Sequence, residues 1–267
     1  MIRLIFSDMD GTLLDDRGHL PAGFGTMYER LKERGIRFAP ASGRQYASLV
    51  RTFAPWQDEM IFLAENGTLV MEGGRELFAA PVDPALGLRV MQTGEALQGV
   101  YSVYCGKKQG YIHRADDVPA FRAELEKYVT KSMVTENFAA VDDVPIKMAF
   151  FDPSGHADTT ILPVMEQYAD RMQVTLSSAL WVDVYAQGVS KGVAAARVQE
   201  HLGLTPDECA AFGDYGNDLE LMDAVTYSFA MANAIPAVQE RARYRAPSNG
   251  EHGVMAVCER ILAGEFD

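Results

Sequence analysis

The sequence predicts an α/β protein whose core is a doubly wound parallel sheet, with a smaller α+β domain inserted into it. Apolar runs alternate with helical patterns near both ends of the chain, which is typical of parallel βαβ units. Several of these runs end in polar residues and glycine, whereas the middle of the chain has short, alternating strands. We therefore assign residues 1–82 and 187–267 to the core and residues 83–186 to the inserted domain.

The first segment predicts three strands separated by two helices. Pro21 lies near the start of the first helix and Gly35 lies just past its end, where each residue type is favoured. Two short strands that flank Glu-Gly-Gly-Arg then predict a hairpin. In order, we expect a strand over 1–6, a helix over 21–34, a strand over 36–41, a helix over 45–53, a strand over 60–64, and the hairpin strands 68–70 and 76–78.

The middle segment predicts an antiparallel sheet with helices on one face. Most of its strands are short and alternate apolar with polar residues, unlike the continuous apolar run at the N-terminus. The expected strands are 101–104, 109–112, 146–151, 173–176 and 180–185, and the expected helices are 84–97, 119–128 and 160–168.

The last segment returns to the first pattern. Ser190 is a favoured N-cap residue and predicts a helix that starts at Lys191. The strand that ends at Phe212 is again followed by glycine and polar residues. The expected strands are 209–212 and 227–231, and the expected helices are 191–201, a short helix that ends at 222, 235–242 and 252–262.

Charge and composition exclude several classes of function. The formal net charge of −13 argues against binding to nucleic acid or to an anionic membrane, because no basic surface is encoded. The three cysteines are far apart and odd in number, which favours reduced thiols in a cytoplasmic protein. No apolar run is long enough to cross a bilayer, and the N-terminus lacks the pattern of a signal peptide. We expect a monomer or a weak homodimer.

Two aspartates, Asp8 and Asp10, directly follow the N-terminal strand and precede Gly11. Ligands of open α/β sheets bind beyond the carboxyl ends of the strands. Residues two apart in an extended chain point the same way, and two like charges that close together favour a cation between them. Carboxylate oxygens suit Mg²⁺. Taken alone, however, Asp-x-Asp-Gly is explained about as well by a strand and a turn.

The other strand ends decide between these explanations, because a doubly wound sheet would bring them to one edge. Aspartates there could hold Mg²⁺, while serine, lysine and asparagine could hold a phosphate. One carboxylate could attack phosphorus and a second could act as acid and base. Each residue alone could be a turn residue or a solvated charge. Four such separate explanations, at four consistent positions in the fold, explain the whole set poorly. The set is Asp8, Asp10, Ser42, Lys191, Asp214, Asn217 and Asp218.

Four segments in this order resemble the motifs of the haloacid dehalogenase-like (HAD) hydrolase superfamily. The inserted domain is similarly placed to the C2B-type α/β cap of the Cof-type phosphatases, and the resemblance covers the whole chain. His252 stands where the family usually has aspartate, outside the catalytic motifs. The matching segments are Asp8-Met9-Asp10-Gly11-Thr12-Leu13, Ala41-Ser42-Gly43-Arg44, Gly188-Val189-Ser190-Lys191-Gly192 and Gly213-Asp214-Tyr215-Gly216-Asn217-Asp218, with Asn233-Ala234 and residues 248–254 closing the pattern.

The resemblance implies a Rossmann-like core and an Mg²⁺-dependent phosphatase that forms an aspartyl-phosphate. It implies that Asp8 is the nucleophile and a metal ligand, and that Asp10 is the general acid/base and binds the metal through its backbone carbonyl. Ser42 and Lys191 would hold the phosphoryl group. The other residues that it implies are Gly43, Arg44, Asn66 and Asn217 at the phosphate and the pocket edge, and Asp214 and Asp218 at the metal.

We expect the substrate to be a small phosphorylated metabolite, such as a sugar phosphate or a phosphorylated cofactor. A phosphomutase or phosphotransferase of the same fold is an alternative, because the sequence does not identify the acceptor. A non-catalytic module that binds a phosphorylated ligand is a further alternative, which the presence of both Asp8 and Asp10 disfavours. In the cap, Lys147 stands out as a charge in an apolar strand pattern, although a snorkelling side chain explains it as well. The other cap candidates are Lys107, Lys108, His113, Arg114 and Trp181.

Overall fold

The strand β1 (Leu4–Ser7) lies in the interior of a five-stranded parallel sheet with the order β14-β13-β12-β1-β2. The computed structural model describes residues 1–266. The apolar residues of β1 are fully buried, as expected for a parallel sheet covered on both faces. The other strands of this sheet are β2 (Arg37–Pro40), β12 (Cys209–Gly213), β13 (Tyr227–Met231) and β14 (Tyr244–Ala246).

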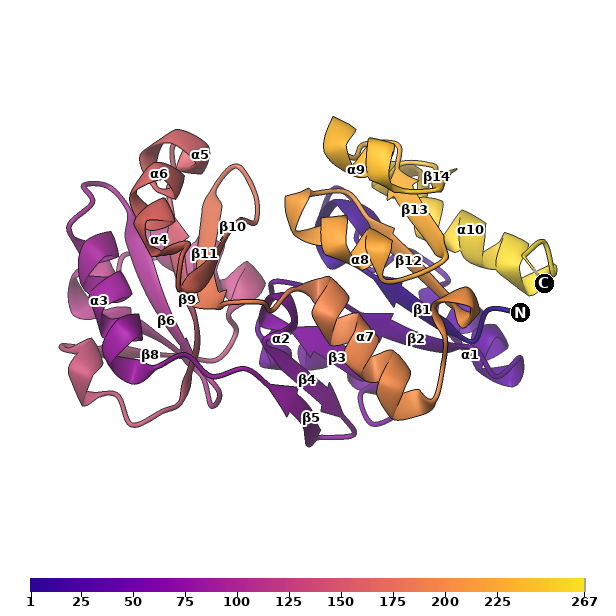
Figure 1. Cartoon of the computed structure of the whole chain (residues 1–267), viewed down its shortest axis with the longest axis horizontal. Helices are drawn as coiled ribbons and strands as arrows, with labels where there is room; N and C mark the ends of the chain where they lie inside the picture. Colours follow the sequence, from indigo (N-terminus) through magenta and orange to yellow (C-terminus); the bar gives the residue numbers. More distant parts are fainter. Residues whose placement is uncertain (267) are drawn as a thin grey trace.

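Helices α1 and α10 pack together beside this sheet, and α8 packs with α7 and α9 (Figure 1). Helix α1 begins at Phe24 rather than at Pro21, because Gly23 has a φ of +84°, which a right-handed helix does not allow. Helix α7 begins as predicted, and the Val193 N–H donates to its N-cap Ser190 Oγ at 3.3 Å. The helices are α1 (Phe24–Glu33), α2 (Tyr46–Thr52), α7 (Lys191–Leu202), α8 (Leu219–Asp223), α9 (Pro236–Arg241) and α10 (Gly253–Leu262).

Strand β3 (Ile61–Ala64) adjoins the end of β2 through a parallel bridge between Ala41 and Leu63. It continues into the predicted hairpin, formed by β4 (Leu69–Glu72) and β5 (Arg75–Ala79). In the turn between β3 and β4, Glu65, Asn66 and Gly67 have φ values of +53°, +59° and +88°. Two of these residues carry side chains, so surrounding contacts must stabilise a backbone conformation that favours glycine.

A separate six-stranded sheet has the order β10-β11-β9-β6-β7-β8 and forms the left half of Figure 1. Its strand pairs are antiparallel except for β7 and β8, which are parallel. We call this half of the molecule the cap. Its strands are β6 (Tyr101–Gly106), β7 (Gly110–His113), β8 (Ser132–Thr135), β9 (Pro145–Phe151), β10 (Met172–Leu176) and β11 (Trp181–Ala186).

Helices cover both faces of the cap sheet, so the expectation of helices on one face is wrong. Every residue of β9 is buried, and side chains alternate along a strand, so both faces need apolar cover. Helices α3 (Pro84–Glu95) and α6 (Leu162–Met165) pack in the cluster that contains Met148 and Phe150. Helix α4 (Pro119–Tyr128) packs against Phe151, on the opposite face.

Three further differences from the predicted elements have local causes. The helix predicted over 160–168 is divided into α5 (Ala157–Thr160), α6 and a turn, and Pro163 lacks the N–H needed to continue a helix there. Strands β8 and β14 were not predicted. Both are short strands at sheet edges and are partly exposed, so they lack a clear apolar pattern.

Two chain connections join the cap to the core, one from β5 to α3 and the other from β11 to α7. Ala80, Tyr185 and Val189 pack together beside them, and Gly188 adopts a φ of +74° in the second connection. Within residues 1–266, none of the helices has the length and apolar character needed to cross a membrane.

Candidate active site

Asp8 follows β1 directly and contacts Lys191, the first residue of α7. The Asp8 N–H donates to the carbonyl oxygen of Phe212 at 3.0 Å, which extends the parallel ladder past the strand. Lys191 Nζ lies 2.5 Å from Asp8 Oδ1 and 2.7 Å from Asp218 Oδ1, and the lysine is fully buried. Burial disfavours its charge, but Asp218 and Asp8 outweigh burial and raise the pKa of Lys191. A fixed cation therefore lies between two carboxylates.

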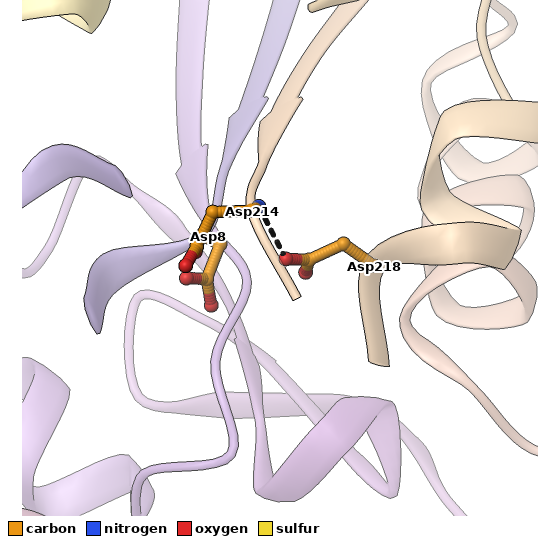
Figure 2. A group of neighbouring side chains, drawn as sticks. All are labelled: Asp8, Asp214 and Asp218. Carbon is orange, nitrogen blue, oxygen red and sulfur yellow. Dashed lines mark hydrogen bonds between the residues drawn. The ribbon is translucent and has the colours of Figure 1, made fainter. Parts of the chain in front are cut away.

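Three carboxylates gather at this edge, and one oxygen from each of Asp8, Asp214 and Asp218 lies within 4.8 Å of the others. Figure 2 shows Asp8 and Asp214 at the ends of their strands, with their carboxylates close together. Asp218 instead accepts hydrogen bonds at Oδ2 from the backbone N–H groups of Asp214, at 3.0 Å, and Tyr215, at 3.2 Å. Both Asp218 oxygens are thus engaged, and this residue holds Lys191 and the loop in place.

The residues after Asp10 support this acidic group. Thr12 Oγ1 donates to Asp214 Oδ1 at 2.8 Å. Gly11 has a φ of +76°, and a Cβ atom at this position would overlap the Asp214 carboxylate, so only glycine fits. Asn233 Nδ2 donates to the carbonyl oxygen of Gly11 at 2.7 Å. The sequence pattern contained Thr12 and Asn233 but gave neither a role.

The acidic group suits a divalent cation. Burial raises the pKa of Asp8 well above its usual value, and Asp218, Asp214 and Asp10 add to this while Lys191 opposes it. Burial, reinforced by Asp218, also raises the pKa of Asp214 to about 7. Mg²⁺ prefers carboxylate oxygens and would relieve this repulsion. The residues fit the ion, with Asp8 and Asp214 best placed to hold it and Asp218 within reach.

We expect Mg²⁺ to bind to the protein more tightly as the pH rises. The pKa of Asp214 is raised, so the metal-free folded protein retains a proton there below about pH 7, and Mg²⁺ must displace it. The dissociation constant should fall by up to about tenfold per pH unit below that value and then level off. Calorimetric titration with Mg²⁺ at pH 6, 7 and 8 measures this. An affinity that stays constant over this range would contradict the assignment, and Asp214→Asn, which cannot hold the proton, is the matched control.

Asp10 points to Arg44 rather than into the acidic group. Arg44 donates from Nε to Asp10 Oδ2 at 2.7 Å and from Nη2 to Asp10 Oδ1 at 2.5 Å, a bidentate ion pair. Its remaining Nη1 donates to the carbonyl oxygen of Lys127 in the cap at 2.7 Å, and the guanidinium lies over the Tyr128 ring. Ser42 Oγ accepts from the Arg44 N–H at 3.2 Å. Arg44 therefore contacts Asp10 and the cap at the same time. The predicted contact of the Asp10 carbonyl with a metal stays a prediction.

The seam between core and cap consists largely of bonds to the cap backbone. Gln45 accepts at Oε1 from the Lys131 N–H at 2.9 Å and donates from Nε2 to the Lys131 carbonyl at 3.0 Å. The Gln45 N–H also donates to the carbonyl of Tyr128 at 2.9 Å. Together with the bond from Arg44, these contacts hold the cap over the carboxyl edge of the core sheet.

Asn66 and Asn217, both from the core, lie together where the core faces the cap. Asn217 Nδ2 donates to Asn66 Oδ1 at 3.1 Å, and Asn66 Nδ2 donates to Asp183 Oδ2 in the cap at 2.7 Å. Gly43 offers its carbonyl oxygen to Lys147 Nζ, also from the cap, at 2.7 Å. The predicted pocket-edge residues are therefore brought together, but in this structure they hold the cap.

A cavity of about 80 Å³ lies between the acidic edge and the cap. Of the predicted site residues, Asp8, Asp10, Ser42, Gly43, Arg44 and Asn217 line it. Of the six cap candidates, only Lys147 and Trp181 do, and Lys147 is buried rather than snorkelling. The residues that the sequence analysis missed are Tyr128, Val129, Ala149, Ser177, Ser178, Asp183 and Tyr215. Asp183 carried the same signal as Lys147, a charge in an apolar strand.

A family model of haloacid dehalogenase-like hydrolases matches residues 5–257. The chain belongs to the haloacid dehalogenase-like hydrolase family. It is 32% identical over 271 residues to the 5-amino-6-(5-phospho-D-ribitylamino)uracil phosphatase YbjI of Escherichia coli (strain K12), covering 99% of this chain and 97% of that one. It is 28% identical to the HMP-PP phosphatase of Citrobacter koseri, covering 88% and 86% of the two chains. With such relatives along its length, the chain is a phosphatase of this family, a phosphoric monoester hydrolase.

Solved structures share the fold of this HAD phosphatase, cap included. SMU.1108c from Streptococcus mutans UA159 superposes with a TM-score of 0.90 at 26% identity, covering 98% of this chain and 100% of that one. The HAD subclass IIB sugar phosphatase BT4131 superposes with a TM-score of 0.81 at 18% identity, covering 97% and 98%. These comparisons confirm the predicted parallel core with its cap.

The closing segment of this HAD phosphatase supports its first motif. Asn249 Nδ2 donates to the carbonyl oxygen of Leu14 at 3.1 Å, and the Asn249 N–H donates to Asn233 Oδ1 at 3.1 Å. His252, which replaces the usual aspartate, is exposed and has a φ of +57° at the start of α10. Aspartate and histidine are both enriched in this left-handed conformation, so the backbone explains why the replacement is tolerated.

Proposed function

We propose that this phosphatase hydrolyses a small phosphorylated metabolite through an aspartyl-phosphate on Asp8, with Asp10 as general acid and base. One observation supports this above all others: Asp8 and Asp10 line the same cavity, and each carboxylate is held by its own cation. Lys191 binds Asp8 Oδ1, which leaves the other carboxylate oxygen for attack on phosphorus.

The reaction then proceeds in two steps on this chain's own residues. Asp8 forms a bond to phosphorus while the bond to the leaving oxygen breaks, and protonated Asp10 donates its proton to that oxygen. Asp10 next takes a proton from water, the water oxygen bonds to phosphorus, and the bond to Asp8 breaks to release phosphate. The bidentate pair with Arg44 positions the Asp10 carboxylate, the form that takes the proton from water, at Nε–Oδ2 and Nη2–Oδ1 distances of 2.7 Å and 2.5 Å. The Ser42 hydroxyl and the Lys191 ammonium would hold the phosphoryl oxygens.

Mg²⁺ is the proposed cofactor, held by Asp8 and Asp214, by the backbone carbonyl of Asp10 and, within reach, by Asp218. When bound, it would neutralise the charge of the phosphoryl group. Asn217, Asn66 and Gly43 would define the phosphate end and the edge of the pocket. The three buried free thiols support a cytoplasmic location, as the sequence analysis expected.

The proposed substrate class is a sugar phosphate or a phosphorylated cofactor. The relative that is 32% identical is named for 5-amino-6-(5-phospho-D-ribitylamino)uracil, and others are named for HMP-PP. These names make phosphorylated metabolites with a heterocyclic or sugar-like portion the first compounds to test. A phosphomutase or phosphotransferase remains an alternative with the same residues, because only the acceptor differs.

The test is phosphate release from a panel of phosphorylated metabolites and p-nitrophenyl phosphate, with Mg²⁺ and with EDTA. We expect Mg²⁺-dependent release from several compounds and none with EDTA. Equal release in both conditions would contradict the cofactor assignment. Phosphate that reappears on another compound, detected by phosphorus NMR, would identify a mutase or transferase instead.

A further inference from the structure

The cap side of the cavity carries charged groups that the proposed reaction does not use. Lys147 and Asp183 line it from neighbouring strands, β9 and β11, and are paired with the core residues Glu65 and Asn66. Tyr128, Val129, Ala149 and Trp181 supply the largely apolar part of the cap wall, and Ser177 and Ser178 add hydroxyl groups to it. The leaving group of a substrate whose phosphate lies at Asp8 would occupy this end.

Lys147 is paired with two carboxylates and with a backbone carbonyl of the core. The Nζ of Lys147 lies 2.7 Å from the Gly43 carbonyl oxygen, 2.7 Å from Glu65 Oε2 and 3.5 Å from Asp183 Oδ1. Burial disfavours the charged form, but Asp183 and Glu65 outweigh burial and raise the pKa of Lys147, so the residue stays a cation. It is a cation whose charge is already compensated.

Glu65 is held where it neutralises Lys147, although its backbone is in the left-handed region at a φ of +53°. Its side chain is 1% exposed, and within residues 1–266 neither carboxylate oxygen has a well-oriented hydrogen bond, although Oε2 lies 2.7 Å from Lys147 Nζ. An unpartnered buried carboxylate oxygen is unfavourable. The ion pair with Lys147 is thus the contact that offsets both the burial and the backbone conformation.

Asp183, in contrast, keeps the capacity to accept a hydrogen bond. Its Oδ2 accepts from Asn66 Nδ2 at 2.7 Å and from Ser177 Oγ at 2.6 Å. Among the described residues, its Oδ1 contacts only Lys147 Nζ, at 3.5 Å. Within residues 1–266, the other cation that lines the cavity, Arg44, is paired with Asp10. The cap end therefore presents an acceptor and no uncompensated positive charge.

We propose that the Glu65–Lys147–Asp183 cluster selects phosphomonoesters whose leaving group is uncharged and donates a hydrogen bond to Asp183, and rejects leaving groups with a second anionic group. This inference rests on the proposed function and deepens it. A carboxylate or second phosphate would face the negative charge of Asp183 in a cap wall that offers it hydroxyl groups but no free cation, which is a repulsive and partly desolvated environment. A hydroxyl or amine hydrogen would instead fill the open position on Asp183.

Two substrates that differ at one carbon test this selection. Sorbitol 6-phosphate and 6-phosphogluconate have the same six-carbon chain and phosphate position, but the far end is a hydroxymethyl group in one and a carboxylate in the other. We expect kcat/KM to be at least about tenfold higher for sorbitol 6-phosphate, because an unpaired charge is rejected more strongly than a missing contact. Equal values, or a preference for 6-phosphogluconate, would overturn the inference.

Two variants test the cause. Glu65→Gln keeps the shape but leaves the charge of Lys147 opposed by Asp183 alone, and Asp183→Asn removes the negative charge that faces the ligand. Each should lower the ratio of the two kcat/KM values by about threefold or more, whereas a ratio that neither substitution changes would overturn the inference. The ratio is measured on one preparation, so partial misfolding cancels. Hydrolysis of p-nitrophenyl phosphate by the unmodified protein distinguishes a failure of this inference from a failure of the proposed function. If no hydrolysis occurred under any condition, the proposed function itself would be contradicted.

Discussion

Asp8→Asn is expected to lower kcat by about 10⁴-fold or more, as for other enzymes that lose a nucleophile. Asparagine has nearly the same shape, and its Oδ1 can still accept from Lys191 Nζ, which lies 2.5 Å from Asp8 Oδ1. The substituted side chain cannot form the phosphoryl ester. We therefore expect catalysis to be lost while the site remains assembled.

The same substitution should leave the metal-free protein as stable as before, or more stable. Burial raises the pKa of Asp8, so the ionised form is disfavoured in the fold and stability falls as the pH rises through that pKa. Asparagine removes this loss, so the gain should be larger at pH 8 than at pH 5. Steady-state kinetics and thermal denaturation in EDTA at both values measure the two effects. Retained activity would exclude Asp8 as the nucleophile, and a large loss of stability would mean that its charge supports the fold.

Lys191→Met should impair both stability and activity. The fully buried ammonium compensates Asp8 and Asp218, and its removal leaves two buried carboxylates without a cation. Breaking a buried ion pair in this way destabilises a protein by about 3–5 kcal/mol. Loss of a positive charge that stabilises the phosphoryl group should lower kcat by about 10²-fold or more. Denaturant unfolding and kinetics at saturating Mg²⁺ provide both numbers.

Two controls separate the contributions of Lys191. Lys147→Met removes another buried lysine that pairs with two carboxylates, so its loss of stability should be similar. Its kcat for p-nitrophenyl phosphate should fall far less, because Lys147 does not contact Asp8. Adding Asp218→Asn to Lys191→Met should recover stability but not activity. If the two lysine variants lost kcat equally, the proposed role of Lys191 at the phosphoryl group would be refuted.

The core half of the site could be predicted from the sequence because its residues follow strand ends. Asp8 and Asp214 lie at the carboxyl ends of neighbouring parallel strands. Lys191 is the first residue of the helix whose start the N-cap Ser190 predicts. The order of elements alone brings such residues to one edge of the sheet. The supporting contacts, such as those of Thr12 with Asp214 and of Asn233 with the Gly11 carbonyl, required the loop geometry.

The cap half could not be predicted, because it depends on how two sheets are placed against each other. Asn66 and Asp183 are 117 residues apart, and their hydrogen bond exists only when the cap lies over the core. Helix α4 was predicted over the correct residues, but the sequence did not predict which face of the cap sheet it covers. Its position on that face brings Tyr128 beside Arg44. A charge in an apolar strand marked Lys147 as unusual, but not as a partner of the core, and the same pattern at Asp183 was not used.

The hydrogen bonds of Arg44 and Gln45 to the cap have a consequence for how this enzyme can evolve. They end on the backbone atoms of residues 127, 128 and 131, which every amino acid supplies except proline at its nitrogen. Side chains on that part of the cap can therefore change without loss of these closure contacts. Changes at these three positions could therefore alter the cavity wall, to which Tyr128 belongs, without removing these contacts, whereas changes at Lys147 or Asp183 would alter both the substrate contacts and the closure of the cap.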